Sequence, residues 1–380
     1  TGLSLIPRAG GTSLAGQVVG KGLIVDISKR CNRIIEFNSS ERWVRVEPGV
    51  IRDDLNKWLQ PHGLFFAPET STANRAMIGG MIGNNSCGSN SILYKSTREH
   101  LLELTALLSD GSEVVFGDIT TDQFHAKCEL QTLEGTIYRH IRQLLSSPEV
   151  RNEIAIHFPH PDIDRRNTGY ALDMLMNADP FEAGGPIFNF CKLIAGSEGT
   201  LCLITAAKLA LVPLPPKETG LLCVHFNSID ESLRANVLAV AFQPSACELI
   251  DHYILECTKD NREQAQNRFF VEGDPGAILV IEFCRDTREE IVAITTKVEA
   301  TLRQHQLGYH FPVLFGNDTK KIWNLRKAGL GLLSNLPGDE KAVPVIEDTA
   351  VRVEDLPNYI REFNQILEQH NLHAVHYAHA

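Results

Sequence analysis

The chain has 380 residues, with 36 Lys and Arg against 47 Asp and Glu, which gives a formal net charge of −11. An acidic chain repels phosphate backbones, so this balance disfavours a nucleic-acid-binding protein. Hydrophobic residues make up 43% of the chain, which excludes disorder and leaves room for a large core. At roughly 150 residues per domain, the length suggests two domains.

The cysteines are scattered along the chain, and none of them forms a C-x-x-C pair. This spacing argues against a disulfide framework, a zinc finger or an iron–sulfur cluster within these residues, and it favours a reducing compartment. No run of about 18 apolar residues is present, so we expect no transmembrane helix. The chain enters at Thr1 and stops at Ala380 without start or stop signals. We therefore expect it to be part of a longer protein.

Residues 1–125 combine short β-type runs with glycine turns. Runs of β-branched and apolar residues bounded by turn formers predict strands at residues 23–27, 42–46, 101–108 and 114–116. The last two would form a hairpin around Asp110-Gly111. Apolar residues at helical spacing over 51–59 predict a helix that stops at Gly63.

The second half of the chain has a different pattern. Residues 126–180 predict helices, and residues 196–212 return to a glycine turn and strands. After a proline cluster at 213–216, strands alternate with helices, with strands expected at 221–226 and 277–283 and helices at 228–241 and from 286 onward. We therefore place a domain boundary at this cluster and expect domains at 1–215 and 216–380.

Residues 7–17, PRAGGTSLAGQ, form the first candidate binding loop. The adjacent Gly10 and Gly11 allow successive backbone N–H groups to converge, and Thr12 and Ser13 add hydroxyl donors. Such a loop suits a phosphate or pyrophosphate. It matches neither a Walker A loop nor a G-x-G-x-x-G fingerprint, and a glycine-rich turn without a ligand explains it equally well.

Two further glycine clusters follow in the chain. Residues 68–73, PETSTA, lead into 78–88, IGGMIGNNSCG, and the third cluster is 195–201, AGSEGTL. An irregular loop held by side-chain-to-backbone hydrogen bonds is the alternative for the second cluster. Three such clusters, each with Ser or Thr, are hard to attribute to coincidence. They indicate close backbone approach to a flat or charged ligand.

Together the clusters resemble the FAD-binding domain of the vanillyl-alcohol-oxidase superfamily. They are most similar to its D-2-hydroxyacid dehydrogenase branch, which includes D-lactate dehydrogenase, the glycolate oxidase flavin subunit and D-2-hydroxyglutarate dehydrogenase. The resemblance implies that the first loop cradles the FAD pyrophosphate, the second lines the isoalloxazine and ribityl side, and the third closes over the cofactor. The implied cofactor-binding residues are Arg8, Gly10, Gly11, Thr12, Ser13, Gly16, Pro68, Ser71, Gly79, Gly80, Asn84, Gly88, Glu198, Gly199 and Thr200.

The resemblance also implies substrate-binding cations. Trp323 to Arg326 resembles the family's W-x-x-R, whose arginine binds the substrate carboxylate through its planar fork. An ion pair between Arg326 and a neighbouring carboxylate is the alternative. Lys341 is a candidate second cation, although a solvated surface lysine explains it as well. One departure is Lys95, which follows Tyr94 where the family often has glycine.

His379 resembles the first of two histidines that bind a divalent metal in many family members. Its partner would lie beyond Ala380, and on a strand His376 would point to the opposite face, so we do not pair them. Zinc would suit such a site and could polarise the substrate hydroxyl. The alternatives are that His379 is the general base or that it only packs.

These observations predict an α+β fold. We expect an N-terminally truncated FAD-binding domain of two α+β subdomains, and a substrate or cap domain with an antiparallel sheet and helices. The resemblance implies oxidation of a D-2-hydroxy acid of the lactate, glycolate or 2-hydroxyglutarate type to the 2-oxo acid, by hydride transfer to flavin N5. Arg326, His379 and Lys341 would be the catalytic residues.

The remaining expectations concern the electron acceptor and the location of the protein in the cell. Electrons would pass to a quinone, a cytochrome or an iron–sulfur module outside these residues. We expect a cytoplasmic protein, and peripheral association with the inner membrane is left open as an alternative. Two other functions also stay open, namely aryl-alcohol oxidation on the same fold and a non-catalytic flavin-binding piece.

Overall fold

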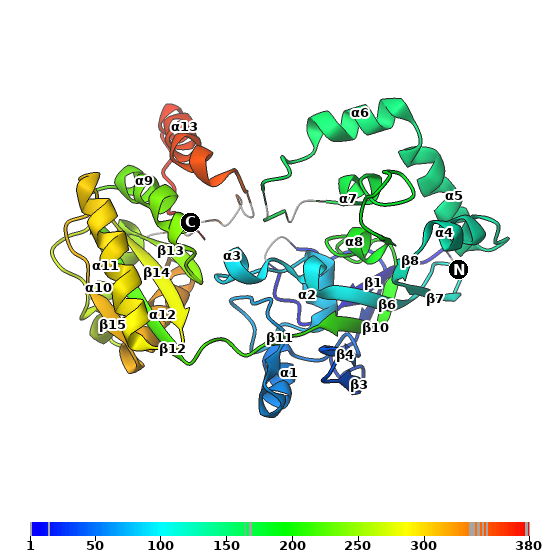
Figure 1. Cartoon of the computed structure of the whole chain (residues 1–380), viewed down its shortest axis with the longest axis horizontal. Helices are drawn as coiled ribbons and strands as arrows, with labels where there is room; N and C mark the ends of the chain where they lie inside the picture. The colour runs from blue at the N-terminus through cyan, green and yellow to red at the C-terminus, as the bar shows by residue number, and fades with distance from the viewer. Residues whose placement is uncertain are drawn as a thin grey trace. The chain divides into compact units, whose positions relative to one another are not determined.

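The computed structural model describes residues 2–13, 16–163, 165–166, 169–333 and 349–376, together with positions 339, 343, 346 and 379. The chain forms two compact units, each built from a sheet and helices (Figure 1). Unit 1 comprises Thr1–Gly88 and Tyr94–Leu214, and unit 2 comprises Ser89–Leu93 and Pro215–Ala380. The α+β prediction is confirmed.

Unit 1 is organised around a five-stranded antiparallel sheet with the strand order β3-β4-β10-β6-β7. These strands are β3 (Ile34–Asn38), β4 (Trp43–Val46), β10 (Leu203–Ala210), β6 (Leu101–Leu107) and β7 (Glu113–Phe116). The predicted hairpin is confirmed, because β6 pairs with β7. Shorter pairs are parallel β1 (Leu5–Arg8) with β2 (Leu23–Asp26), and antiparallel β5 (Leu64–Phe65) with β11 (Val212–Pro213) and β8 (Asp118–Ile119) with β9 (Phe188–Asn189).

The helices of unit 1 complete its core. They are α1 (Arg52–Leu59), α2 (Ile78–Asn84), α4 (Thr121–Cys128), α5 (Leu133–Leu145), α6 (Pro148–His157), α7 (Leu172–Met176) and α8 (Cys191–Ile194). Helix α1 buries Leu55 and Leu59, and the chain turns at Gly63, whose φ of 72° suits glycine. The predicted stop at Gly63 is therefore confirmed. Phe124 of α4, Tyr138 of α5 and Phe188 of β9 form an aromatic cluster within this core.

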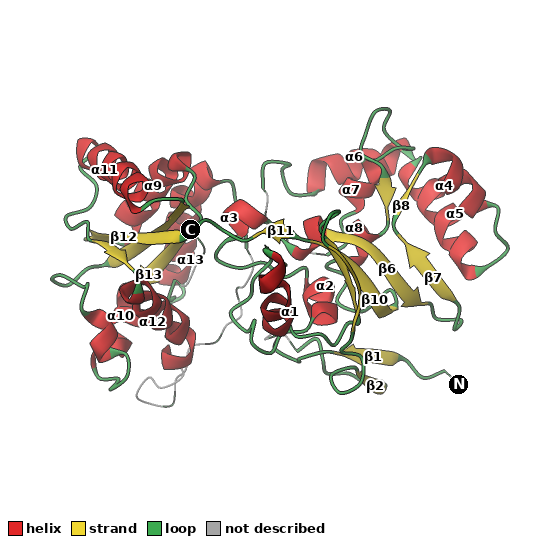
Figure 2. Cartoon of the chain, turned by 60° about the horizontal axis from the view of Figure 1, so that its bottom comes forward, coloured by secondary structure: helices red, strands yellow, loops and turns green. Residues whose placement is uncertain are grey.

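Unit 2 is an antiparallel sheet covered by helices on both faces (Figure 2). Its strand order is β13-β14-β12-β15, with β13 (Ala246–Asp251), β14 (Ala277–Arg285), β12 (Glu218–Phe226) and β15 (Val313–Phe315). Its helices are α9 (Ile229–Ala239), α10 (His252–Lys259), α11 (Arg288–Gln304), α12 (Asn317–Leu333) and α13 (Leu356–Gln369), and α3 (Ser91–Tyr94) begins in its inserted segment. The predicted antiparallel sheet with helices is confirmed.

Each face of this sheet has its own apolar core. Alternate residues of β12, such as Leu222 and Val224, pack with residues of α9 and α11. Leu221 and Cys223 point the other way and pack with residues of α10 and α12, including Leu325. Burial on both faces explains why β12 and β14 read as continuous apolar runs. Among the described residues, no helix is long and apolar enough to cross a bilayer.

Buried His225 on β12 predicts a pH-dependent stability. Burial lowers its pKa from 6.5 to about 4, and its Nδ1 lies 3.0 Å from the carbonyl oxygen of Cys223. As the pH falls, His225 therefore takes up its proton at a higher pH in the unfolded chain than in the folded one. The stability that the neutral histidine contributes is fully present above pH 6.5 and falls as the pH drops toward 4. The expected loss attributable to His225 is roughly 3 kcal/mol.

Urea unfolding at pH 7.5 and pH 5 measures this effect. His225→Asn keeps a donor for the Cys223 carbonyl but does not titrate in this range, so its stability should depend less steeply on pH. Equal pH dependence in the variant and the wild type would contradict the assignment.

Candidate functional site

The second and third glycine clusters meet in unit 1. The Glu198 N–H donates a hydrogen bond to the Gly83 carbonyl over 2.9 Å, and the Asn84 amide nitrogen lies 3.4 Å from the Glu198 carboxylate. Gly199 faces the first segment, because a Cβ there would lie 3.4 Å from the ring of Pro7. Residues more than a hundred positions apart in the chain therefore share one locality.

The first cluster lies against the second. A Cβ on Gly80 would come 3.1 Å from the Cβ of Ala9, so α2 approaches the first loop by way of its glycine face. The hydroxyl of Thr72 donates to that of Thr12 over 3.3 Å, which links the residues that precede α2 to the same loop. The structure thus brings all three predicted clusters together.

The first loop has the donor set of an anion cradle. Gly11 has a φ of 62°, and a Cβ there would lie 3.0 Å from the Arg8 guanidinium. Gly10 is equally confined, because its Cβ would lie 2.6 Å from the carbonyl oxygen of Arg75. A guanidinium, backbone N–H groups and the Thr12 hydroxyl are the groups that bind a phosphate. This donor set fits the diphosphate of FAD.

The other predicted cofactor residues lie in the same segments. A Cβ on Gly79 would meet Pro48 at 2.7 Å, and one on Gly88 would meet the Glu69 carbonyl at 2.8 Å, so side chains are excluded at both. The Thr200 hydroxyl donates to the Ser197 carbonyl over 2.5 Å. The remainder, Ser13, Gly16, Pro68 and Ser71, lie outside the helices and strands, in turns and loops.

Lys95 has a φ of 58°, which is the left-handed conformation. Glycine adopts this conformation without a steric penalty, whereas other L-residues are strained there by about 1–2 kcal/mol. The chain thus keeps a glycine-type backbone at the position where the resembled pattern often has glycine.

Unit 2 contains a second cluster, centred on the carboxylate of Glu248. The Arg326 Nη2 donates to Glu248 Oε2 over 2.7 Å, and His379 Nδ1 lies 2.5 Å from Glu248 Oε1. Glu248 and Arg326 are nearly fully buried, with side chains 1% and 3% exposed, whereas that of His379 is 30% exposed. Burial lowers the pKa of Arg326, and the charge of Glu248 opposes that shift. The two residues proposed from the sequence as catalytic therefore share one buried partner.

Strand β13 and helix α12 position this cluster. Glu248 lies on the face of the sheet that α10 and α12 cover, and its backbone forms an isolated antiparallel bridge with His379. A second buried carboxylate, that of Glu282, lies on the same face of the sheet and also contacts a side chain of α12. Trp323, one turn before Arg326, donates from Nε1 to Glu282 on β14 over 3.0 Å, and Asn90 donates to the other oxygen of Glu282 over 3.2 Å.

The structure leaves two sequence expectations without a test. Lys341 lies outside the described residues, so its role stays a prediction. Around His379, the described residues do not bring together the three groups that a metal site needs. They bring three potential ligands together elsewhere, at His252, Glu256 and Asp274, where Lys259 Nζ lies 2.5 Å from the Glu256 carboxylate. The donor set described at His379 therefore does not fit a complete zinc site.

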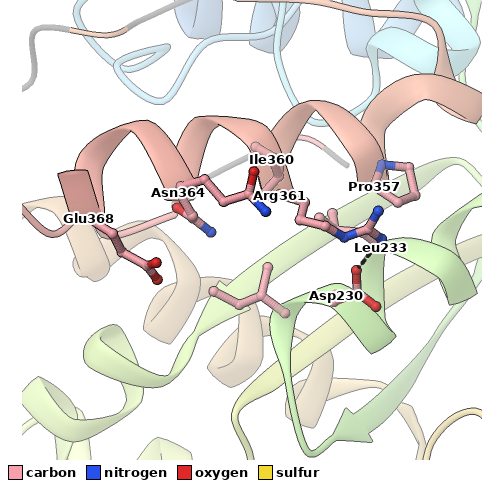
Figure 3. Close-up of a pocket in the computed structure, with 9 residues that line it drawn as sticks. Asp230, Leu233, Pro357, Ile360, Arg361, Asn364 and Glu368 are labelled. Atoms are coloured by element: carbon pink, nitrogen blue, oxygen red, sulfur yellow. Dashed lines mark hydrogen bonds and ion pairs between the residues drawn. The ribbon is translucent and has the colours of Figure 1, made fainter.

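A cavity of about 440 Å³ lies between α9 and α13, away from these residues (Figure 3). Its wall includes an exposed ion pair, in which Arg361 Nη2 lies 2.7 Å from Asp230 Oδ1. None of the residues predicted as functional lines it.

Glu248 is the residue that the sequence reasoning missed. It interrupts the apolar run Ala246-Cys247-Glu248-Leu249-Ile250 of β13. Acidic residues are almost never fully buried unless they are paired. A lone carboxylate inside an apolar strand was therefore a signal for a buried partner, although it could not name that partner.

Comparison with known families identifies the class of protein. Residues 1–117 match the family model described as FAD binding domain, and residues 215–380 match that described as FAD linked oxidases, C-terminal domain. The chain therefore combines a region that matches an FAD binding domain with a region that matches the C-terminal domain of FAD linked oxidases.

The chain is similar to D-2-hydroxyglutarate dehydrogenases and to a glycolate oxidase subunit. The chain is 35% identical to D-2-hydroxyglutarate dehydrogenase of Escherichia coli (strain K12) over 382 residues, which cover 97% of this chain and 36% of that protein. It is 34% identical to the protein of the same name from Pantoea ananatis, with the same coverage. Glycolate oxidase subunit GlcD of Bacillus subtilis is 24% identical over 99% of this chain and 65% of its own length. The chain thus spans about a third of the length of the D-2-hydroxyglutarate dehydrogenases.

Solved structures agree on the fold. An alkyldihydroxyacetonephosphate synthase superposes with a TM-score of 0.55 and 14% identity, covering 87% of this chain and 51% of that one. At this identity the likeness concerns the fold alone.

Proposed function

We propose that the protein oxidises a D-2-hydroxy acid to the corresponding 2-oxo acid, with FAD bound in unit 1 and the substrate bound in unit 2. The observation that carries the proposal is the meeting of three separate glycine clusters around a loop with an anion-binding donor set. Bound FAD would supply the hydride acceptor. The similar proteins are named for 2-hydroxyglutarate, glycolate and lactate, and these names support this substrate class.

The chain's own residues have distinct tasks in this proposal. Arg8, Thr12 and the amides of the first loop hold the diphosphate, and the glycines of α2 and of residues 196–200 let these segments pack closely against that loop. In unit 2, Arg326 supplies the positive charge for a substrate carboxylate, and His379 accepts the proton of the substrate hydroxyl. A guanidinium has five N–H donors, so one arginine can serve both Glu248 and an acidic ligand.

A visible absorption spectrum of the complete protein tests the proposal. Flavin absorbance should be present and should bleach on addition of D-2-hydroxyglutarate, D-lactate or glycolate, and should stay unchanged with the L-enantiomers of the chiral acids. The most effective acid identifies the substrate. A colourless protein, or a flavin that bleaches with none of these acids, would refute the proposal. The electron acceptor, for which we propose a quinone, a cytochrome or an iron–sulfur module, is then the compound that reoxidises the flavin.

The loop assignment predicts that Gly11→Ala loses FAD. A Cβ at this position would press on the Arg8 guanidinium at 3.0 Å, and it would strain a backbone with φ of 62°. Flavin content should fall at least tenfold, measured as the ratio of absorbance at 450 and 280 nm.

Gly63→Ala is the matched control for strain. Gly63 has a φ of 72°, but nothing lies within 4 Å of the added Cβ. Both variants should lose about 1–2 kcal/mol of stability from the left-handed backbone. Only Gly11→Ala should lose the flavin, and full flavin content in that variant would remove the first loop from the cofactor site.

A further inference from the structure

Arg98 is a buried arginine of unit 1 to which the proposed function assigns no task. The residue is only 2% exposed. Its guanidinium donates from Nη2 to the Ala195 carbonyl over 2.6 Å and from Nη1 to the Arg166 carbonyl over 3.2 Å. A buried cation is tolerated where hydrogen bonds replace its water, and main-chain carbonyls supply them here. Ala195 is the first residue of the third glycine cluster, so the arginine is bonded directly to that cluster.

Asn85 connects the same arginine to the second glycine cluster. It follows the last residue of α2 in the left-handed conformation, with a φ of 55°, and it is fully buried. Its Oδ1 accepts from the Arg98 backbone N–H over 2.8 Å, and its Nδ2 donates to the Arg166 carbonyl over 3.2 Å. The Arg166 carbonyl is therefore shared by Asn85 and Arg98. One hydrogen-bonded network thus joins the end of α2 to the start of the third cluster.

The third cluster continues along the end of α2. The Gly196 N–H donates to the Ile82 carbonyl and the Glu198 N–H donates to the Gly83 carbonyl, each over 2.9 Å. Both carbonyls belong to the last turn of α2, where a helix leaves carbonyl groups open to outside donors. Gly196 has a φ of 88°, and a Cβ there would lie 2.8 Å from Arg98 Nη2. Glycine therefore lets the cluster approach the helix and the guanidinium together.

We propose that Arg98 is a positioning residue of the cofactor site, which holds the third glycine cluster against α2. Its planar fork reaches the Ala195 and Arg166 carbonyls at once, a geometry that suits arginine. Because Ala195 immediately precedes residues 196–200, these hydrogen bonds fix the cluster before the cofactor binds. A binding loop that is ordered in advance loses less entropy on binding. The inference rests on the proposed function for the identity of the cofactor, whereas the network itself is independent of any activity.

Hydrogen exchange of the complete protein tests the network without an activity assay. Exchange is followed by mass spectrometry in peptides that cover residues 193–202 and the strands β6 and β10. In Arg98→Met, which removes the donors but keeps a long side chain, residues 193–202 should exchange faster. The peptides of the two strands should keep their wild-type rates, because the opening is local. Unchanged exchange over residues 193–202 in a folded Arg98→Met protein would overturn the proposal.

Arg98→Met should also release FAD faster, because the cluster that closes over the cofactor is no longer held in place. The rise in fluorescence of free FAD measures the rate, which should increase by roughly tenfold or more. Arg98→Lys keeps the charge but not the planar fork, and Gly196→Ala presses on the guanidinium from the other side. Both should release FAD faster than the wild type. Wild-type release rates in these two variants would overturn the proposal even if Arg98→Met does not fold.

Ile154→Ala is the matched control for lost stability. Ile154 is 4% exposed and packs in the core of unit 1, so its truncation should lower the urea midpoint but leave the hydrogen bonds of Arg98 intact. FAD release and exchange over residues 193–202 should stay at wild-type rates. Equal acceleration in Ile154→Ala and Arg98→Met would overturn the proposal, because general destabilisation would explain it. A wild-type protein that lacks flavin or oxidises no 2-hydroxy acid would refute the proposed function, and the exchange measurement would still decide the role of Arg98.

Discussion

Arg326→Met is expected to lower kcat/KM toward D-2-hydroxy acids by about 100-fold or more, because a charged hydrogen-bonded contact to a carboxylate is worth roughly 2–5 kcal/mol. The same change should destabilise the protein by about 3–5 kcal/mol, because it leaves Glu248 as an uncompensated charge that is 1% exposed. Flavin content and kcat/KM are measured together, and stability is measured by urea unfolding. An unchanged kcat/KM would exclude Arg326 from substrate binding.

A double-mutant cycle separates the two effects. In the Glu248→Gln background the buried carboxylate that pairs with Arg326 is gone, so Arg326→Met should cost much less stability there than in the wild type. Its loss of substrate affinity, read as a rise in KM, should persist if Arg326 binds the carboxylate. Arg361→Met is the surface control, because its pair with Asp230 is exposed and should contribute less than about 1 kcal/mol.

Local patterns in the sequence predicted those helices whose first residues form a recognisable N-cap. Ser228 caps α9 by accepting a hydrogen bond from the Glu231 N–H, at the start of the helix predicted for residues 228–241. The helix expected from residue 286 begins at Arg288 instead, because Thr287 is its N-cap and forms a capping box with Glu290. Such boundaries depend on single hydrogen bonds and shift by a residue or two.

Sequence reasoning did not predict the elements in which apolar and polar residues show no regular periodicity. Strand β13 is a six-residue run that is buried on both faces, so it shows no alternation. Helix α12 places Trp323 and Arg326 one turn apart facing two carboxylates, yet neither carboxylate is near them in the chain. The resemblance made Arg326 a candidate, whereas its contact with Glu248 depends on tertiary structure.

The candidate site also has features that the sequence could predict and features that it could not. The glycine clusters could be found from the sequence because a ligand-binding loop needs several small residues in succession. That the clusters meet could be expected only from the resemblance, and the structure gives the contacts. Glu248 joins Arg326 and His379 across 78 and 131 positions, a relation that no motif of adjacent residues could contain.

His379→Ala is expected to lower kcat by about 100-fold or more, because it removes the group that accepts the hydroxyl proton. Flavin content should stay normal, since His379 lies in unit 2. His376→Ala is the control, because His376 is close in the chain but contacts Asn364 and Asp251 and not Glu248. Similar losses of kcat in both variants would point to a structural effect of this segment and contradict a specific role for His379.

Chelation then distinguishes the two chemical roles of His379 in the complete protein. If His379 is a general base, the protein should retain its turnover after treatment with a chelator, with the metal content measured to confirm removal. If the histidine holds a divalent metal, chelation should abolish turnover, leave the flavin bound and be reversed by added zinc, and His379→Ala should lose metal and activity together. Among the described residues, His379 contacts the Glu248 carboxylate, but no group of three potential metal ligands forms around it. We therefore expect the general-base outcome from these residues, and metal-dependent turnover would show that ligands outside them complete the site.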